Sequence, residues 1–161
     1  RVMTLEQACA RVEEARAEGK VIVTTNGCFD IIHAGHVSCI EVAKSFGDLL
    51  VIGVNTDESV RKLKGPGRPV NPLEERMLVL AGLRTVDIVC SFADDTSVPF
   101  VQAIKPDVHV KGGDYVISEM PEAQVVAEVG GRIELAPLVG GRSTTRLLEK
   151  INDLFESGRL P

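Results

Sequence analysis

Several features of common protein classes are missing from this sequence of 161 residues. No stretch approaches the roughly 18 uninterrupted apolar residues that a membrane-spanning helix requires. The N-terminus lacks the basic-then-apolar order of a signal peptide. The net charge of −5 argues against a general nucleic-acid-binding protein. We therefore expect a cytoplasmic protein that binds neither membranes nor nucleic acids.

The four cysteines lack the spacing of a metal or redox site, because no two of them form a CxxC motif. We interpret them as small core residues. Cys28 is an exception, because it lies in a glycine-containing turn, where an exposed thiol could be chemically modified. We expect no zinc in the protein.

Two phosphate-binding motifs and several catalytic motifs are also missing. No GxxxxGK[ST] is present, and no GxGxxG follows a predicted strand, which excludes P-loop and dinucleotide-binding sites. There is no Ser-His-Asp order, reactive-cysteine signature or paired-carboxylate motif. These absences do not exclude an enzyme, because a phosphate monoester that attacks a triphosphate is already ionised and needs no general base.

Short β-rich segments alternate with segments of helical period, which is typical of a parallel sheet covered by helices on both faces. The expected strands are residues 21–25, 49–54, 86–90, 108–111 and 132–135. The length suits one domain, and no repeat or linker interrupts it. The sequence therefore predicts a single α/β domain over 1–161, Rossmann-like, with three α/β/α layers and a five-stranded parallel sheet.

Capping signals predict three helices. Thr4 and Gln7 form a capping box for a helix that ends at Gly19 and packs on the domain. Asn71 is the expected N-cap of a helix over 71–84, followed by proline and an acid. A last helix is expected after Thr144, and the side chains on its predicted buried side are Leu147, Leu148, Ile151, Leu154 and Phe155.

The most informative segment follows the first predicted strand. It comprises Asn26, Gly27, Cys28, Phe29 and Asp30, then His33, Ala34, Gly35 and His36. The unpaired amides and the positive dipole end of a starting helix bind phosphate well. Two imidazoles there indicate phosphate chemistry. A metal pair at i, i+3 is the alternative, but His109 is the only other histidine and no acid cluster stands nearby.

Two further loops are expected at the same edge of the sheet, because ligands of such folds bind at the carboxyl ends of the strands. One follows the fourth predicted strand and contains Lys111, Gly112, Gly113 and Asp114. The other precedes the last helix and contains Gly141, Ser143, Thr144 and Thr145. A Ser-Thr-Thr run is most often a helix cap, and capping leaves neighbouring amides available for an anion.

The segment 61–68 places four cations, including Lys64 and Arg68, next to helix-breaking glycine and proline. Such a run is usually a solvated loop. Because Asn55 and Asp57 stand at the end of the second predicted strand, the alternative is a mobile basic flap that closes on substrate phosphate.

The segment 26–36, called the histidine segment below, resembles the HxGH motif of the nucleotidyltransferases. From Gly19 onward the chain is similar to the heptose 1-phosphate adenylyltransferases, including the C-terminal half of the bifunctional heptose kinase/adenylyltransferase. The similarity is carried by residues 26–38, 64–77, 91–96, 105–115 and 143–145. It implies transfer of AMP from ATP to D-glycero-β-D-manno-heptose 1-phosphate, giving ADP-heptose for lipopolysaccharide or related glycans. The length leaves no room for the kinase half, so a monofunctional enzyme is expected.

The resemblance also implies roles for single residues. The catalytic residues would be His33 and His36 at the triphosphate, with Lys44 neutralising phosphate charge. Those binding ATP would be Asn26, Gly27, Cys28, Phe29, Asp30, Gly35, Lys111, Gly112, Gly113, Asp114, Gly141, Ser143, Thr144 and Thr145. Those binding the sugar phosphate would be Asp30, Asn55, Asp57, Lys64, Arg68 and Arg76. For Arg76, an intrahelical ion pair is the alternative.

Magnesium is expected as cofactor, since it bridges phosphate oxygens and needs few protein ligands. We also expect a homo-oligomer, specifically a dimer. Three other functions remain open. One is a cytidylyltransferase acting on a polyol phosphate such as glycerol 3-phosphate. Another is a pantetheine-phosphate or nicotinamide-mononucleotide adenylyltransferase, which fits the chemistry but not the match over Lys111 to Tyr115. The third is a nucleotide sensor that binds ATP without releasing pyrophosphate.

Overall fold

The computed structural model describes residues 1–137 and 143–160. Within them, one sheet contains β1 (Ile22–Gly27), β2 (Leu49–Asn55), β3 (Ile88–Phe92), β4 (Val108–Gly112) and β5 (Arg132–Ala136). The strand order is β3-β2-β1-β4-β5, and neighbouring strands are parallel. The predicted α/β fold with a five-stranded parallel sheet is therefore confirmed.

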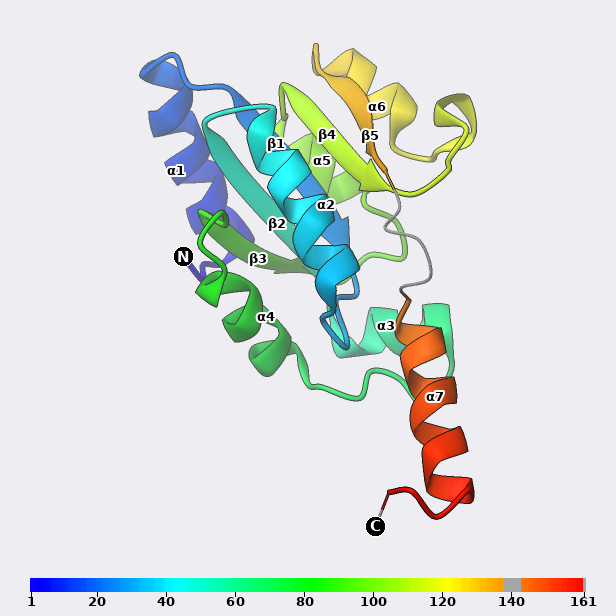
Figure 1. The fold of residues 1–161 in the computed structure, drawn as a ribbon. Coiled ribbons are helices and arrows are strands. Elements are labelled where there is room, and N and C mark those ends of the chain that lie inside the picture. Colours follow the sequence, from blue (N-terminus) through cyan, green and yellow to red (C-terminus); the bar gives the residue numbers. More distant parts are fainter. Residues whose placement is uncertain (138–142, 161) are drawn as a thin grey trace.

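Helices cover both faces of this sheet (Figure 1). Their bounds are α1 (Leu5–Ala17), α2 (Ala34–Ser45), α3 (Asp57–Lys64), α4 (Leu73–Gly82), α5 (Val98–Ile104), α6 (Ala123–Glu128) and α7 (Thr144–Glu156), with a short 3-10 turn η1 (Ile117–Glu119). One face is covered by α2 and α4, and the other by α1, α5 and α6. The predicted three-layer arrangement follows from this division.

The inner strand β2 shows how one strand packs against helices on both faces of the sheet. Successive side chains of a strand point to opposite faces. Leu50 and Ile52 pack in the cluster with α2 and α4, whereas Leu49 and Val51 pack in the cluster with α1 and α5. Every residue of β2 is buried. A continuous apolar run without polar alternation is typical of a parallel strand that is covered on both sides.

Two strands differ from their predicted bounds. β1 is longer than predicted, because Asn26 and Gly27 still pair with β2. The first residues of the histidine segment are thus part of the rigid sheet. β3 begins two residues later than predicted: the Asp87 carboxylate accepts the Leu50 amide hydrogen at 2.8 Å, and the ladder to β2 starts at Ile88.

The predicted capping box of the first helix is confirmed, since Thr4 and Gln7 exchange hydrogen bonds between side chain and backbone. The predicted cap at Asn71 is wrong. The N-cap of α4 is Pro72, and the Asn71 side-chain Nδ2 instead donates to the Asp30 backbone carbonyl at 2.6 Å. A tertiary contact here replaces the local one.

Three helices, α3, α5 and α6, were not among the predicted elements. α5 and α6 have seven and six residues, too few for a helical period to stand out. The basic loop predicted over 61–68 is wrong in its first half, because residues 61–64 form the last turn of α3, which ends at Gly65 with a φ of 97°. Cations in a last turn suit the negative end of the helix dipole.

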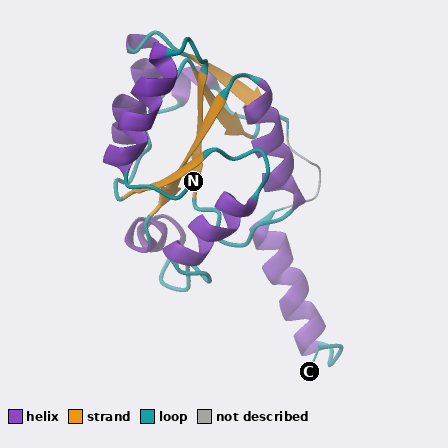
Figure 2. Cartoon of the chain, turned by 90° about the vertical axis from the view of Figure 1, so that its left-hand side faces the viewer, coloured by secondary structure: helices purple, strands orange, loops and turns teal. Residues whose placement is uncertain are grey.

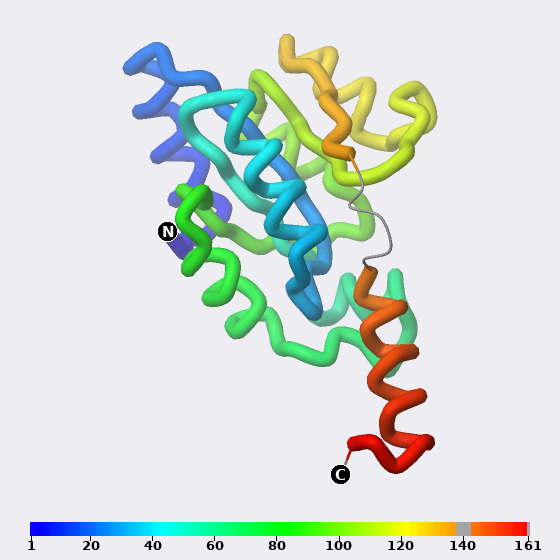
Figure 3. The backbone as a smooth tube through the Cα atoms, viewed as in Figure 1, coloured from blue at the N-terminus to red at the C-terminus, as the bar shows by residue number. Residues whose placement is uncertain are grey.

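The last helix, α7, projects away from the body of the protein (Figure 2). None of its residues is buried, and Ile151 and Phe155 are 49% and 64% exposed. The apolar side of this helix was predicted to be buried, and that prediction is wrong for this chain. The backbone trace shows that α7 begins close to α3, near the turn that leads into α2 (Figure 3).

Candidate active site

A pocket of about 720 Å³ opens at the carboxyl ends of β1, β2 and β4. The chain moves outward from β1 to β3 and then returns to place β4 beside β1. The pocket therefore lies where the strand order reverses, as expected for ligand sites in open α/β sheets. The predicted site residues that line it are Asn26, Gly27, Cys28, Phe29, Asp30, His33, Gly35, His36, Asn55, Lys64, Arg68, Lys111, Gly112, Ser143, Thr144 and Thr145.

The two histidines form the start of α2. His33 is the N-cap, and its Nδ1 accepts the Gly35 amide hydrogen at 3.1 Å. The His33 amide in turn donates to Nδ1 of His36 at 3.3 Å. The two rings are in contact, with centroids 3.9 Å apart and planes tilted by 33°. This is a capping box in which imidazoles replace the usual hydroxyl and carboxyl groups.

His36 is neutral around physiological pH. Burial, together with the neighbouring His33, lowers the pKa of His36 from 6.5 to about 4. Because its Nδ1 accepts a backbone hydrogen bond, the neutral ring carries its proton on Nε2. His36 can therefore offer the pocket a hydrogen-bond donor without a full charge.

The Phe29 side chain supports the His36 ring, with centroids 5.5 Å apart. Phe29 has a φ of 47°, which is uncommon for a residue other than glycine. A side chain on Gly27 would lie 3.2 Å from the Phe29 ring, so this glycine leaves room for the ring. The turn is thus folded around an aromatic residue that contacts the second histidine.

Asp30 ties this turn to the connection between α3 and α4. One carboxylate oxygen accepts the amide hydrogens of Val70 and Asn71 at 2.8 and 2.9 Å, and the other accepts from Arg68. Burial alone would raise the pKa of Asp30, but these donors outweigh it and keep the pKa below its usual value. Asp30 and Arg68 line the pocket, yet both are engaged with each other.

Arg76 does not line the pocket, so its predicted role in binding the sugar phosphate is wrong. Its guanidinium is buried and donates to the carbonyl oxygens of Cys28, Asn55 and Asn71. It also pairs at 2.8 Å with Asp57, which does not line the pocket either; the predicted contact of Asp57 with the sugar phosphate stays a prediction. The ion pair is formed between helices rather than within one. The planar guanidinium, with its five N–H donors, can bind these three carbonyl oxygens and the carboxylate at the same time.

Lys44, which was predicted to neutralise phosphate charge, lies away from the pocket. It lies in the last turn of α2, eight residues and thus about 12 Å along the helix from His36. Its ammonium contacts the Asp87 carboxylate at 2.7 Å and the Asp48 carbonyl at 2.6 Å. Lys44 therefore stabilises the end of the sheet opposite the pocket.

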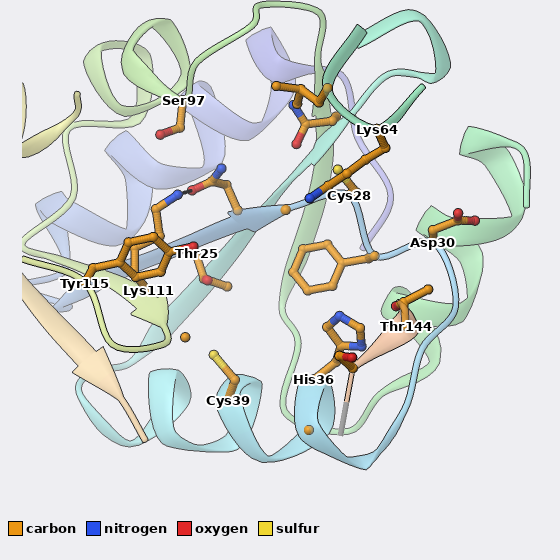
Figure 4. A pocket seen from close by; sticks show the side chains of 18 of the residues that line it. Thr25, Cys28, Asp30, His36, Cys39, Lys64, Ser97, Lys111, Tyr115 and Thr144 are labelled. Carbon is orange, nitrogen blue, oxygen red and sulfur yellow. Dashed lines mark hydrogen bonds between the residues drawn. The ribbon is translucent and has the colours of Figure 1, made fainter. Parts of the chain in front are cut away.

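The end of β4 contributes Lys111 to the pocket wall, where its ammonium lies 2.9 Å from the Asn26 side-chain oxygen (Figure 4). Gly112 allows close packing, because a Cβ there would lie 2.8 Å from the Cys39 sulfur. Gly113 turns the chain with a φ of 140°. Neither Gly113 nor Asp114 lines the pocket, and their contacts with ATP stay a prediction.

The start of α7 closes another side of the pocket. Ser143 is the N-cap and accepts the Arg146 amide hydrogen at 3.2 Å. The Thr144 hydroxyl donates to the Ile31 carbonyl at 3.3 Å, which links α7 to the turn before α2. The predicted cap is confirmed here, while the phosphate contact stays a prediction. The predicted ligand Gly141 lies outside the described residues.

Several pocket residues were not predicted as ligands. Cys39 lies three residues after His36 on α2, and this helical spacing alone would have indicated that both face the pocket. Ser97 and Glu122 are buried polar residues from later segments of the chain. The Ser97 hydroxyl has no hydrogen-bond partner among the described residues. No local signal indicates that these two residues reach the pocket.

The cysteines are poor nucleophiles. Burial raises the pKa of Cys28 and of Cys39, although the charge of Lys64 partly opposes this at Cys28. Burial raises the pKa of Cys90 to about 12. The thiols are therefore protonated near neutral pH, and the concern about a modifiable Cys28 loses its chemical basis.

Two kinds of feature are missing from residues 1–137 and 143–160. No group of three or more His, Cys, Asp or Glu residues there is arranged to hold a metal ion. No helix in these ranges is long and apolar enough to cross a membrane.

Comparisons with known proteins agree with this geometry. Residues 24–151 match the family described as Cytidylyltransferase-like. The bifunctional protein HldE of Alcanivorax borkumensis is 51% identical over 152 residues, which is 94% of this chain and 32% of that protein. This chain thus spans about a third of the length of that relative.

Two solved structures share the fold. A lipopolysaccharide core biosynthesis protein from Thermoplasma volcanium superposes with a TM-score of 0.60 at 26% identity, covering 74% of this chain and 97% of that one. Pantoate-beta-alanine ligase from Francisella tularensis gives a TM-score of 0.59 at 14% identity, covering 99% and 79%. The second likeness concerns the fold alone. Because the family match includes the pocket from Thr25 to Thr145, this protein belongs to the cytidylyltransferase-like family and is a nucleotidyltransferase.

Proposed function

We propose that this nucleotidyltransferase transfers AMP from ATP to D-glycero-β-D-manno-heptose 1-phosphate, giving ADP-heptose and pyrophosphate. The observation that carries the proposal is the 51% identity to a bifunctional HldE protein across the whole pocket-forming region. The product would be a precursor for lipopolysaccharide or a related surface glycan. The name of the Thermoplasma volcanium relative, a lipopolysaccharide core biosynthesis protein, supports this biological context.

In the proposed reaction, an oxygen of the sugar phosphate attacks the α-phosphorus of ATP. A new P–O bond forms, the bond to the β-phosphate breaks, and the electron pair leaves with pyrophosphate. The nucleophile is already ionised, so the pocket needs no general base. Positioning and stabilisation of the developing negative charge are sufficient.

His36 is assigned to the α-phosphate in this proposal. Its neutral Nε2–H would donate to an equatorial oxygen as charge develops there, and the backbone hydrogen bond to Nδ1 keeps the ring in place. The positive end of the α2 dipole lies at the same point, because His36 belongs to the first turn of this helix. Ser143 and Thr144 are assigned to the β- and γ-phosphates, because the start of α7 forms the opposite side of the pocket.

The acceptor is assigned to the side of the pocket formed by β2, α3 and the segment after β3. Asn55, Lys64 and Ser97 line this side. Lys64 extends from the end of α3 over Cys28, toward the middle of the pocket (Figure 4). An ammonium from α3 and a buried hydroxyl are suitable partners for a sugar phosphate, which combines anionic and hydroxyl oxygens.

Magnesium is part of the proposal as a cofactor that neutralises triphosphate charge. The pocket acids among the described residues are Asp30, Asp95 and Glu122. Asp30 is engaged with Arg68, and Glu122 lies 2.8 Å from the Lys111 ammonium. Asp95 is exposed, its ion pair with Lys62 is long at 3.8 Å, and we assign it to the ion. This limited donor set fits magnesium, which keeps several waters and is held largely by the phosphates of its substrate.

A second candidate is the cytidylyltransferase reaction with CTP and a polyol phosphate such as glycerol 3-phosphate. The description of the matched family favours it. The phosphate contacts would be the same, so the two candidates differ in the base and in the acceptor. A dimer also remains part of the proposal, since the exposed apolar residues Ile151 and Phe155 of α7 are available to a second copy.

Pyrophosphate release tests these assignments directly. With magnesium, ATP plus the heptose 1-phosphate is expected to release pyrophosphate far faster than CTP plus glycerol 3-phosphate, because unpaired polar groups at a base-binding site discriminate by several powers of ten. Faster release with CTP and glycerol 3-phosphate would favour the cytidylyltransferase reaction instead. Binding of ATP without release from any acceptor would favour a nucleotide sensor. Sedimentation of the same sample reports whether a dimer forms.

A further inference from the structure

A buried acid and a buried histidine lie behind Lys111 in the pocket wall. The side chains of His109 and Glu122 are 0% and 4% exposed. Glu122 Oε1 lies 2.8 Å from Lys111 Nζ and 3.6 Å from His109 Nε2. A buried carboxylate is strongly destabilising unless it is paired. Lys111 and His109 are the groups that compensate it here.

The strand pattern explains why these groups meet. His109 and Lys111 are two residues apart on β4, so both side chains lie on the same face of the sheet. Thr24 stands opposite His109 in the pairing of β1 with β4, and its hydroxyl lies 2.7 Å from His109 Nδ1. Glu122 is the residue immediately before α6, which brings it over this face.

The hydrogen-bond geometry favours one tautomer of His109. If the Thr24 hydroxyl donates to Nδ1, the proton of the neutral ring is on Nε2 and faces Glu122 Oε1. The other tautomer would place a nitrogen lone pair against the carboxylate in a buried site. Burial lowers the pKa of His109 more than Glu122 raises it, so the ring is neutral. At 3.6 Å the ring makes no hydrogen bond to the carboxylate, and its N–H stabilises the negative charge only as a nearby dipole.

Glu122 is ionised in this environment. Burial alone would raise the pKa of Glu122, but His109 and Lys111 outweigh it and hold the pKa well below its usual range. The Glu122 carboxylate and the Lys111 ammonium therefore form a charged pair. Because the pair has no net charge, Lys111 contributes a directed donor to the pocket rather than a general attraction for anions.

The Lys111 ammonium is held from two sides. It has three N–H donors. One is donated to the Asn26 side-chain oxygen at 2.9 Å, and the ammonium forms an ion pair with Glu122 Oε1 at 2.8 Å. Asn26 belongs to β1, so both acceptors come from rigid or buried positions. The long side chain is thereby ordered before a ligand binds, which reduces the entropy lost on binding.

We propose that Glu122 is a positioning residue that, with His109 behind it, holds the Lys111 ammonium against Asn26 so that its remaining N–H is directed at a bound nucleoside triphosphate. The inference rests on the proposed function only for the identity of that ligand as ATP. Glu122 itself acts through Lys111.

A double-mutant cycle tests this coupling. The dissociation constant of ATP is measured by calorimetry for the wild type, Glu122→Gln, Lys111→Met and the double variant. Glu122→Gln is expected to weaken binding about tenfold, as for loss of a hydrogen bond between charged groups. It should weaken binding no further when Lys111 is already Met. Additive losses, or wild-type affinity in folded Glu122→Gln, would overturn the proposal.

Two further variants separate positioning from packing. Glu119→Gln removes an exposed acid three residues away and should bind ATP like the wild type. Glu122→Asp keeps the charge and should recover part of the affinity lost in Glu122→Gln. If Glu122→Gln does not fold, Glu122→Asp replaces it in the cycle, with a smaller loss that again disappears in the Lys111→Met background.

A measurement without ligand makes the test independent of the proposed reaction. Carbon relaxation of the Lys111 ε-methylene group should show a rigid side chain in the wild type and in Glu119→Gln, and a mobile one in Glu122→Gln. Unchanged mobility in folded Glu122→Gln would contradict the positioning role. If the wild type releases no pyrophosphate from any nucleotide and sugar phosphate, the proposed function fails, while this relaxation measurement still decides the role of Glu122.

Discussion

α2 and α7 both begin at the pocket, but they are anchored to the protein in different ways. α2 packs Ile40 and Ala43 into the core against the sheet. α7 buries none of its residues, and its first turn contacts the pocket turn through the Thr144 hydroxyl. The start of α2 is therefore a rigid, pre-organised donor site. The start of α7 adds donors whose position depends less on core packing.

This difference predicts different kinetic roles. A pre-organised donor is most effective where charge develops in the transition state. Groups on the departing pyrophosphate contribute mainly to ATP binding. We therefore expect substitutions at the start of α2 to affect turnover, and substitutions at the start of α7 to affect affinity.

The largest effect is expected for His36→Ala, with turnover reduced at least about a hundredfold, the usual loss for a transition-state donor. The melting temperature should change little, because His36 is only half-buried. Lys44→Ala is a matched control at the other end of α2 and should keep turnover within about twofold. Turnover of both variants is measured as pyrophosphate release. A nearly fully active His36→Ala would remove His36 from the reaction.

A smaller effect is expected when Ser143 and Thr144 are both replaced by Ala. Loss of two hydroxyl donors should weaken ATP binding about tenfold, at roughly 1 kcal/mol for each neutral hydrogen bond. The melting temperature should stay close to that of the wild type, since α7 contributes no buried residue to the core. Calorimetry with ATP makes the measurement. Unchanged affinity would mean that these residues only cap α7 and link it to the turn.

The smallest effect concerns the pH dependence of stability. The pKa of His36 is about 4 in the folded protein and 6.5 when unperturbed. As the pH falls from 6.5 to 4, the unfolded chain binds a proton that the folded protein does not, so the stability contributed by neutral His36 is lost over this window.

Melting temperatures across that window should therefore fall less steeply in His36→Gln than in the wild type. The double Ser143, Thr144 variant carries no titrating substitution and should keep the wild-type slope. An equal slope in His36→Gln would indicate that the ring already titrates near its ordinary pKa.

The sequence was informative where chemistry is local. The alternation of β-rich and helical segments was sufficient for the parallel sheet, because burial on both faces demands continuous apolar strands. The histidine pair was recognisable because a helix start needs capping groups within a few residues. The capping box of Thr4 and Gln7 follows from the same short range.

Predictions failed where a residue is engaged by a distant one. Asn71 is a residue type that often caps helices, but its side chain donates to the Asp30 carbonyl instead. Arg76 and Lys44 have the charge of phosphate ligands but are bound by Asp57 and Asp87. A charged side chain can satisfy several partners, and only the packing of elements determines which of them is within reach.

The sequence by itself thus determined the fold class, the edge of the sheet that carries the pocket and the histidines at its centre, because these depend on periodicity and on neighbours a few residues apart. Tertiary structure decided which cations face the pocket, that α7 stands outside the core, and that Glu122 and His109 lie behind Lys111. These properties arise from side chains brought together across the sheet, and burial makes each such pairing strong enough to override local preference.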